Sequence, residues 1–332
     1  MGERERPADP VDRRVAAALV LHPRASWGLI AQVLGIPEST VARRGARLCS
    51  RGVVKVLGTL DVIAAGRGTP VLMRVSCTPG TAPTVAAELA GRSEVWMAHL
   101  LSGTVDCMAE VVVADPGQLA ELAYERLGGM QGVTGSSSHV VIRRFATAHG
   151  WDSGVLGQDV VRRLRGSRAD RWDHGEQAGQ VGTLTEVDEE IVAALQADGR
   201  MRWVDVAARA GVMERTARRR ADELMHRGLL RMRAVVDPGL FGLAVRALLW
   251  VRIDPSRLTT VGQALAGHSS VLLLAATTGE FNLCGEIAVR DYAQLYEFLT
   301  TVLGALPGVR DIDLTLELRT LKRAGELTEE QT

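Results

Sequence analysis

Arginine is concentrated in two short stretches of this 332-residue chain, ESTVARRGARL at 38–48 and ERTARRRADEL at 214–224. A guanidinium group presents several donors in one plane, so it binds phosphate oxygens and guanine edges with paired hydrogen bonds. A helix that buries Val41 and Leu48 turns the polar side chains of the first stretch outward, and the second stretch has the same spacing. The residues expected on the two outer faces are Ser39, Arg43, Arg47, Arg215, Arg218 and Arg219. Helices of this kind fit the major groove of duplex DNA.

Further cations lie close to these stretches. Arg44 and Arg220 fall on the flank of the predicted helices, where a guanidinium group suits either a phosphate contact or an ion pair within the protein. Lys55, Arg231 and Arg233 follow in β-rich segments and suit contacts to backbone phosphates, which position a protein without reading sequence. The predicted DNA-binding set is Ser39, Thr40, Arg43, Arg44, Arg47, Lys55, Arg215, Thr216, Arg218, Arg219, Arg220 and Arg231.

Charge is uneven along the chain, although Lys plus Arg and Asp plus Glu both number 39. Residues 11–61 hold eight basic and three acidic side chains, whereas residues 187–237 hold ten and nine. A basic patch in a balanced chain indicates local contact with a polyanion. Each cation that neutralises a phosphate adds about 0.9 to the salt slope on duplex DNA. We therefore expect the first segment to bind DNA more strongly than the second.

The chain matches itself at a shift of 176 residues. Arg24 and Trp27 recur as Arg200 and Trp203, and the register holds without insertion from residue 11 to about residue 144. Self-similarity over such a length indicates a duplicated structural unit.

The segment 146–183 between the copies is rich in glycine and charge. We expect it to be a linker in which VLGQDVVRRLRG forms a short helix. Trp151 and Trp172 suggest that the linker packs against the rest of the protein.

The front of each copy has the pattern of a winged helix-turn-helix. Apolar residues at helical spacing predict helices over 11–21 and 187–197, and Thr185 with Asp188 fits a capping box. A second helix, a glycine-containing turn, the arginine-rich helix and a β-hairpin are expected to follow in each copy. These two domains are expected at 1–62 and 184–240.

The back of each copy predicts the order βαββαβ, which is typical of a ferredoxin-like fold with helices on one face of the sheet. These domains are expected at 67–145 and 243–321. The open face of each sheet must be covered, and a second copy of the same sheet covers it most economically. The predicted class is therefore α+β, with two copies of a winged helix-turn-helix followed by a ferredoxin-like domain that form a pseudo-dimer within one chain.

Both copies resemble the Lrp/AsnC, or feast/famine, family of bacterial transcriptional regulators. The second copy carries VDEEIVAALQADGR, GVMERTARRR and RGLL, and the first carries VDRR, GIPESTVARR and RGVV, in the order of the family's front motif. The resemblance implies a sequence-specific DNA-binding regulator whose back half is a ligand-binding and oligomerisation (RAM) domain modulated by an amino acid or related metabolite. It implies at least a dimer of the chain, and an effector site formed with the turn residues Gly103, Asp106, Gly279 and Asn282.

The chain departs from the family pattern at a few positions. Pro37 and Met213 stand where a serine N-cap is usual, so a side-chain cap is lost. Gly45 lies inside the first arginine-rich helix, at a cost of about 0.5–1 kcal/mol relative to alanine. Val105 replaces the usual aromatic residue of the first turn, and Asn282 replaces the usual aspartate of the second.

Two other functions fit the same resemblance. Siroheme decarboxylases are similar to this family and occur as fused two-unit chains, but the junction VVDPGLFG carries no histidine, and His99 and His139 are isolated. A module that assembles with other regulators of the family and binds DNA only weakly fits the modest charge of the second copy.

Other function classes lack a sequence signature. Gly66-Arg67-Gly68 is too short for a dinucleotide-binding fingerprint, and no P-loop is present. The four cysteines show no C-x-x-C spacing, so we predict no catalytic residue, cofactor or metal site. No apolar run reaches about 18 residues, and the charged start MGERERPADP lacks the apolar core of a signal peptide. A cytoplasmic protein without membrane contact is therefore expected.

Overall fold

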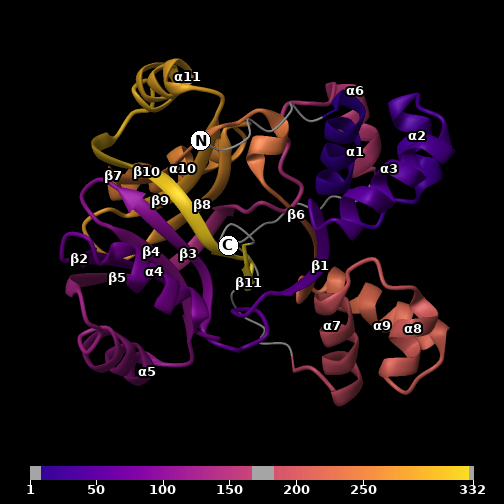
Figure 1. The fold of residues 1–332 in the computed structure, drawn as a ribbon, viewed down its shortest axis with the longest axis horizontal. Helices are drawn as coiled ribbons and strands as arrows, with labels where there is room; N and C mark the ends of the chain where they lie inside the picture. The colour runs from indigo at the N-terminus through magenta and orange to yellow at the C-terminus, as the bar shows by residue number, and fades with distance from the viewer. Residues whose placement is uncertain (1–8, 167–182, 329–332) are drawn as a thin grey trace. The chain divides into compact units, whose positions relative to one another are not determined.

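The computed structural model describes residues 9–166 and 183–328 and divides them into two units. The first, which we call the head unit, contains residues 9–66, 147–166 and 183–243. The second, the barrel unit, contains residues 67–146 and 244–328. Each unit therefore takes one part from each copy of the repeat (Figure 1).

Three helices form each of the two heads in the head unit. They are α1 (Pro10–Leu21), α2 (Trp27–Leu34) and α3 (Glu38–Ser50) in head 1, and α7 (Glu186–Ala197), α8 (Trp203–Arg209) and α9 (Glu214–His226) in head 2, which is followed by a 3₁₀ turn at Pro238–Phe241. The predicted capping box is confirmed, because Thr185 and Asp188 bond each other's backbone at the start of α7. Pro37 and Met213 precede α3 and α9, and neither supplies a side-chain cap. These two helices therefore depend on burial of their apolar sides.

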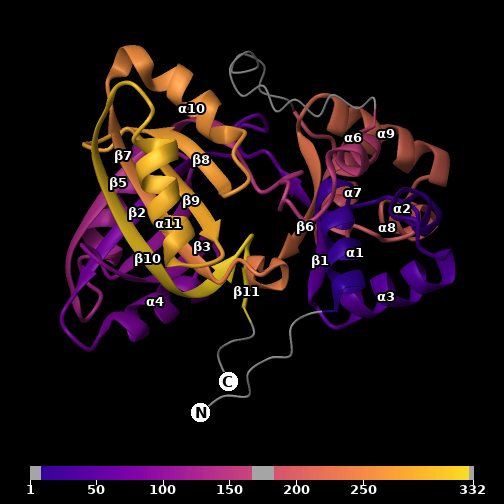
Figure 2. The same ribbon diagram turned by 90° about the horizontal axis from the view of Figure 1, so that it is seen from above.

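The strands that follow α3 and α9 belong to one shared sheet. β1 (Val54–Leu60) and β6 (Leu230–Val236) pair antiparallel, with Leu57 opposite Arg233 at the centre of the register. The sequence predicted a hairpin inside each copy, and this detail is wrong, because each copy supplies one strand and the two strands pair with each other (Figures 1 and 2). Leu57 and Arg233 are equivalent residues of the repeat, so a local two-fold axis relates the two strands.

A reciprocal pair of arginines also joins the heads. Arg24 of head 1 donates to two backbone carbonyls of head 2, and its guanidinium lies 4.4 Å from the centroid of the Trp203 ring. Arg200 of head 2 donates to two carbonyls of head 1 and lies 4.1 Å from the centroid of the Trp27 ring. The accepting residues are Gly199, Met201, Pro23 and Ala25. Burial lowers the pKa of both guanidinium groups, and the same contacts made in both directions hold the heads in a two-fold arrangement.

Part of the segment between the copies packs on the heads. α6 (Gln158–Arg165) confirms the predicted short helix, and it contacts α1 and α2 with Leu164 almost fully buried. Trp151 packs edge-on against Phe241 in the 3₁₀ turn that follows head 2, with ring centroids 5.8 Å apart. The segment therefore touches head 1 and the turn after head 2, while Trp172 lies outside the described residues.

Eight strands of the barrel unit close into a ring. The first copy contributes β2 (Thr69–Cys77), β3 (Val95–Ser102), β4 (Cys107–Val113) and β5 (Val133–Ala146), and the second contributes β7 (Val245–Ile253), β8 (Val271–Thr277), β9 (Leu283–Val289) and β10 (Val309–Arg323). The order around the ring is β3-β4-β2-β5-β8-β9-β7-β10, and β10 returns to pair with β3. A short strand, β11 (Glu326–Leu327), pairs with the end of β10. Each copy keeps the ferredoxin-like strand order and also pairs its last strand with the sheet of the other copy, at β5–β8 and β10–β3.

Helices cover the outside of the ring (Figures 1 and 2). They are α4 (Ala82–Gly91) and α5 (Pro116–Ala120) on the first copy, and α10 (Leu258–Ala266) and α11 (Tyr292–Glu297) on the second. π-Helical stretches at Glu121–Arg126 and Phe298–Leu303 extend α5 and α11, and a 3₁₀ turn at Pro255–Arg257 precedes α10. One apolar core lies beneath the helices of each copy, and a further core lies between the copies, where Leu72, Leu248 and Trp250 are buried. The predicted α+β class, the βαββαβ order and the mutual covering of the two sheets are confirmed.

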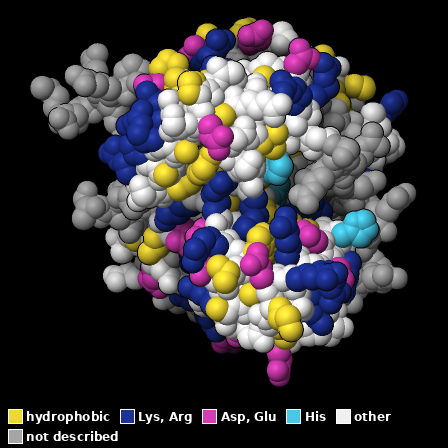
Figure 3. All heavy atoms as spheres, turned by 90° about the vertical axis from the view of Figure 1, so that its right-hand side faces the viewer, with side chains coloured by type: hydrophobic (Ala, Val, Ile, Leu, Met, Phe, Trp, Pro, Cys, Tyr) yellow, Lys and Arg dark blue, Asp and Glu magenta, His cyan; other side chains and the backbone are white. Residues whose placement is uncertain are grey.

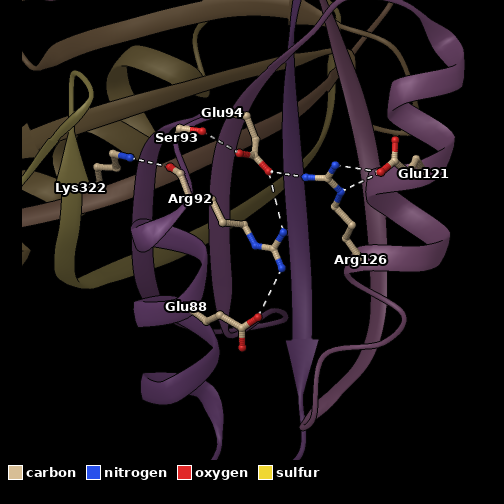
Figure 4. Close-up of polar contacts among 7 residues, drawn as sticks. All are labelled: Glu88, Arg92, Ser93, Glu94, Glu121, Arg126 and Lys322. Carbon is tan, nitrogen blue, oxygen red and sulfur yellow. Dashed lines mark hydrogen bonds and ion pairs between the residues drawn. The ribbon is translucent and has the colours of Figure 1, made fainter.

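An ion-pair network on the barrel unit joins the first copy to β10 (Figure 4). Glu94 contacts the guanidinium groups of Arg92 and Arg126, each of which also reaches a further glutamate. Lys322 of β10 donates to the backbone carbonyl of Arg92 at 2.6 Å. Burial works to raise the pKa of Glu94, but its hydrogen bonds and the two arginines outweigh burial and lower that pKa. The network therefore ties the loop before β3 to a strand of the second copy.

Candidate nucleic-acid interface and effector cavity

Helices α3 and α9 expose the faces that the sequence predicted. Val41 and Leu48 are buried in α3, and Ala217 and Leu224 are buried in α9. The predicted residues on the exposed sides are Ser39, Arg43, Arg47, Arg215, Arg218 and Arg219, with Thr40 and Thr216 half-buried beside them. Figure 3 views the side of the molecule that carries these helices, and Lys and Arg side chains gather there in several groups with acidic side chains between them.

Arg44 and Arg220 join α3 and α9 to the first helix of their own heads. Arg44 of α3 contacts Asp12 of α1 at 3.0 Å, and the equivalent Arg220 of α9 contacts Asp188 of α7 at 3.1 Å. Burial works to raise the pKa of Asp188, but hydrogen bonds from Thr185 and the Arg220 guanidinium lower it below its ordinary value. Of the two roles that the sequence left open for these arginines, the ion pair is present, and a phosphate contact stays a prediction.

The other arginines differ in whether a carboxylate neutralises them. Arg47 contacts Asp12 at 2.5 Å, and Arg219 contacts Glu223 one turn further along α9 at 2.5 Å. Glu223 is the equivalent of Arg47, so head 1 has a cation where head 2 has a carboxylate. Within residues 9–166 and 183–328, no ion pair forms at Arg43, Arg215 or Arg218.

Lys55 and Arg231 are equivalent residues on the shared β1–β6 sheet. Both are half-buried, and Arg233 is 7% exposed. Because the predicted hairpin does not form, these cations lie on a strand pair shared by the heads and not at the tip of a wing. Their contact with DNA phosphates stays a prediction.

The two turns predicted to form the effector site are pinned to neighbouring backbone. The Asp106 carboxylate accepts from the Cys77 amide at 2.7 Å. The Asn282 side chain accepts from the Ile253 amide and donates to the Ile253 carbonyl, both at 2.8 Å. The exchange of aspartate for asparagine therefore keeps the amide contact and adds a second hydrogen bond, so both side chains hold the shape of their turns.

The second turn requires glycine at position 279 because its backbone packs closely against the His139 ring. Gly279 has a φ of +101°, and an added Cβ would lie 2.7 Å from the His139 ring. An added Cβ at Gly103 of the first turn would likewise lie 3.0 Å from the side chain of Thr315, the equivalent of His139. These glycines let each turn pack against the last strand of the other copy.

An open cavity of about 540 Å³ lies beside the two turns. Its lining comes from both copies: Arg74, Thr104, Val105, Ser137, Phe281, Asp311, Ile312, Asp313 and Leu314. The buried Arg74 guanidinium contacts Asp313 at 2.5 Å and lies 4.7 Å from the centroid of the Trp250 ring. The Thr104 hydroxyl donates to the same Asp313 carboxylate at 2.8 Å. A cation, a carboxylate, a hydroxyl and apolar surface therefore meet at one cavity.

The four predicted effector residues frame the turns but do not line this cavity. Sequence reasoning missed Arg74 and Asp313, which do line it. The available signal was the repeat itself, because Arg74 is equivalent to Trp250 and Asp313 is equivalent to Ser137, and such unlike pairs mark positions where the two copies have diverged.

The two isolated histidines are interior residues. The Nδ1 atom of His99 lies 3.2 Å from the carboxylate of Glu317, and Arg246 contacts the same carboxylate at 2.7 Å. Burial works to raise the pKa of Glu317, but His99 and the nearby arginines lower it well below its ordinary range. His139 is buried with its Nδ1 atom 3.0 Å from the Thr278 carbonyl oxygen, and burial lowers the pKa of its ring.

All four cysteines are free thiols. In the part of the chain that the structure describes, no three His, Cys, Asp or Glu side chains gather as a metal site. Among the same residues, no helix is both long and apolar enough to cross a membrane.

Family models match both copies of the repeat. The Lrp/AsnC ligand binding domain matches residues 70–150 and 246–327. An AsnC-type helix-turn-helix domain matches residues 184–225, and a winged helix-turn-helix DNA-binding domain matches residues 9–55.

Individual relatives match one copy at a time. The chain is similar to the uncharacterised HTH-type transcriptional regulator PF1231 of Pyrococcus furiosus, at 29% identity over 143 residues that cover 43% of this chain and 96% of that protein. It is similar to the HTH-type transcriptional regulator FL11 of Pyrococcus horikoshii, at 27% identity over 145 residues that cover 43% of this chain and 95% of that protein.

A solved structure resembles both copies together. The siroheme decarboxylase NirDL matches with a TM-score of 0.61 over 95% of this chain and 93% of that chain. The two sequences are 16% identical, so this likeness concerns the fold alone. The family models and the relatives agree on a narrower conclusion: the chain belongs to the Lrp/AsnC family of HTH-type transcriptional regulators, and it carries two copies of the two-domain unit in one polypeptide.

Proposed function

We propose that the chain regulates transcription by inserting α3 and α9 into the major groove of duplex DNA. The observation that carries this proposal is the two-fold arrangement of two arginine-bearing helices, held by the β1–β6 pairing and by the Arg24 and Arg200 contacts. Guanidinium groups on such helices suit guanine edges and phosphates. We further propose that head 1 contributes more affinity, because residues 11–61 hold eight basic and three acidic side chains, whereas residues 187–237 hold ten and nine and Arg219 pairs with Glu223.

Charge reversal tests this ranking. The best site from genome-wide DNA capture is titrated with the purified chain at several salt concentrations. Arg43→Glu is expected to lower affinity more than Arg219→Glu and to reduce the salt slope by about 1. Arg126→Glu in the barrel unit is the matched control and is expected to leave binding unchanged. Equal losses of affinity in the two variants contradict the ranking of the heads. A wild-type chain that does not bind duplex DNA at modest salt contradicts the proposal and favours a module that assembles with other regulators.

We also propose that an amino acid or a related small metabolite modulates the regulator by binding in the cavity beside the turns of Gly103 and Gly279. Arg74 suits a carboxylate, and Asp313 suits an ammonium group, because charge-assisted hydrogen bonds are the strong ones. Phe281 adds apolar surface for a side chain. Asp106 and Asn282 support this site indirectly, by holding the turns in shape.

A panel of amino acids tests the effector proposal. At least one is expected to raise the thermal unfolding midpoint and to change DNA affinity, and Arg74→Met is expected to remove both effects. Arg310→Met, which breaks an exposed ion pair with Asp254, is the matched control. A ligand whose effects survive Arg74→Met binds elsewhere and contradicts the choice of cavity.

Three further properties follow from this assignment and belong to the proposal. The chain is a regulator and not an enzyme, so incubation with siroheme is expected to leave the absorbance of siroheme unchanged, and a decarboxylated product would overturn this. It acts in the cytoplasm, where chromosomal DNA is reached. It forms at least a dimer of chains, which suits the exposed Ile142 and its equivalent Leu318, and which light scattering measures.

A further inference from the structure

The recognition helices α3 and α9 are related by a two-fold axis in their backbone. Leu57 and Arg233, equivalent residues of the repeat, face each other at the centre of the β1–β6 register. Arg24 and Arg200 make the same contacts in opposite directions. Two identical heads arranged in this way bind palindromic DNA, because the two-fold axes of protein and operator coincide.

The side chains on the two outer faces do not obey this symmetry. Threonine at Thr40 and Thr216 and arginine at Arg43 and Arg219 are the same in both heads. The pairs that differ, with every member exposed, are Ser39 and Arg215, Ala46 and Asp222, Arg47 and Glu223, and Ser50 and His226. The two helices therefore present different chemistry in the same geometry.

These differences change which base edges each head can bind. Arg215 gives the start of α9 a guanidinium group that suits the O6 and N7 acceptors of guanine, and α3 has no such group at the equivalent position. Further along α9, Asp222 and Glu223 offer acceptors that suit the cytosine amino group. At the corresponding place in α3, Arg47 is a hydrogen-bond donor, and the cytosine amino group, which is also a donor, does not pair with it.

We infer that the chain reads a non-palindromic operator in a single orientation. The operator has two unlike half-sites about one helical turn apart, one for each head. The half-site of head 2 carries guanine beneath Arg215 and cytosine near Asp222 or Glu223, and the half-site of head 1 does not. This inference rests on the proposed DNA binding and adds the class of sequence that is recognised.

Selection from a random duplex library with the purified full chain tests the inference. One motif without two-fold symmetry is expected, and replacing either half-site with a copy of the other is expected to lower affinity about tenfold or more. A palindromic motif, or equal affinity for a symmetrised site, overturns the inference and leaves DNA binding intact. A library in which no sequence is enriched overturns both.

Exchange of the outer faces provides a second test. The head-2 variant, which gives α9 the outer face of α3, carries Arg215→Ser, Arg218→Ala, Asp222→Ala, Glu223→Arg and His226→Ser. Its reciprocal in head 1 carries Ser39→Arg, Ala42→Arg, Ala46→Asp, Arg47→Glu and Ser50→His. Each variant is expected to keep the wild-type unfolding midpoint within a few degrees and to select a palindrome, built from the head-1 half-site in the first case and the head-2 half-site in the second. A folded variant of either kind that still selects the wild-type motif overturns the inference.

Discussion

Gly45 lies in the middle of α3, where glycine weakens a helix by about 0.5–1 kcal/mol relative to alanine. Its presence has a packing reason, because an added Cβ would lie 2.4 Å from the Trp27 ring. We expect Gly45→Ala to destabilise the chain by about 1–3 kcal/mol, as overpacking does, although alanine favours the helix. Urea unfolding measures the change, with Gly91→Ala as a control that has open space around it. A more stable Gly45→Ala chain would contradict the packing argument.

The surroundings of Asp188 set its pKa and thereby the pH dependence of its contribution to stability. Its pKa is lowered by Thr185 and Arg220, so the ionised form stabilises the fold. We expect Asp188→Asn to cost about 1.5–3 kcal/mol at pH 7, the range for hydrogen bonds to charged groups. An unfolded aspartate has a pKa of about 3.9, so the wild-type advantage is complete above about pH 5 and shrinks as the pH falls through the lowered folded pKa.

Urea unfolding of both chains at pH 7 and pH 3 checks this, and the difference between them is expected to be smaller at pH 3. Asp205→Asn, which removes the partner of Arg202 on the exposed surface of α8, is the control and is expected to change little at either pH. A wild-type advantage that is the same at both pH values would contradict the ion-pair argument.

Single residues were predicted from the sequence where local spacing decides their place. The buried and exposed sides of α3 and α9 follow from helical periodicity, and both are confirmed. The partner of Arg44 was not predicted, because Asp12 lies on another helix and its distance depends on tertiary packing. Arg74 and Asp313 were missed for the same reason, since they come from different copies and meet only in the closed ring.

At the scale of elements, the contact between the heads is the feature that DNA binding would use. Arg24 and Arg200 each combine a cation–π contact with two hydrogen bonds. We expect the double variant Arg24→Met, Arg200→Met to lower affinity for a two-half-site operator about tenfold or more. When the heads are no longer held together, binding of one head gives the other a lower effective concentration at its own half-site. Affinity for a single half-site is expected to stay the same, as both fluorescence-anisotropy titrations would show.

Arg126→Met in the barrel unit is the matched control for this double variant. Equal losses on one and two half-sites would mean that the arginines contact DNA themselves or support the fold of each head, and would contradict a role in joining the heads.

Elements were predicted well in type and less well in pairing. The helices and the βαββαβ order follow from periodicity and are confirmed. The β1 and β6 segments were correctly identified as strands, but a strand pattern does not name its partner, so the local hairpin was preferred and is wrong. The far ends of β5 and β10 pair with the sheet of the other copy, and a strand pattern gives no sign of such a partner.

At the scale of the whole molecule, the duplication predicted an internal pseudo-dimer, and the unlike residues along its axis make that pairing selective. Arg74 lies against Trp250, its own equivalent, and Leu57 lies opposite Arg233. A dimer of two first copies would place Arg74 against Arg74, and a dimer of two second copies would place Arg233 against Arg233. Like charges in contact disfavour both.

We therefore expect the two halves to prefer each other when they are made as separate chains. Co-expression of residues 1–166 with residues 183–332 is expected to give a one-to-one complex in native mass spectrometry. Arg74→Trp in the first half is expected to increase pairing of first halves with each other, because it removes the repulsion. A statistical mixture of all three pairs from the unaltered halves would contradict selective pairing.

The return of β10 to β3 has a consequence for how the chain is made. Roughly 200 residues separate these strands, and a ribosome adds about 5–20 residues per second, so β3 waits about 10–40 s for its neighbour. Unpaired strand edges invite association with other chains, and nascent copies on one messenger RNA are close together. The pairing that completes the ring therefore forms long after β3 is made, and shielding by a chaperone is of most use during that interval.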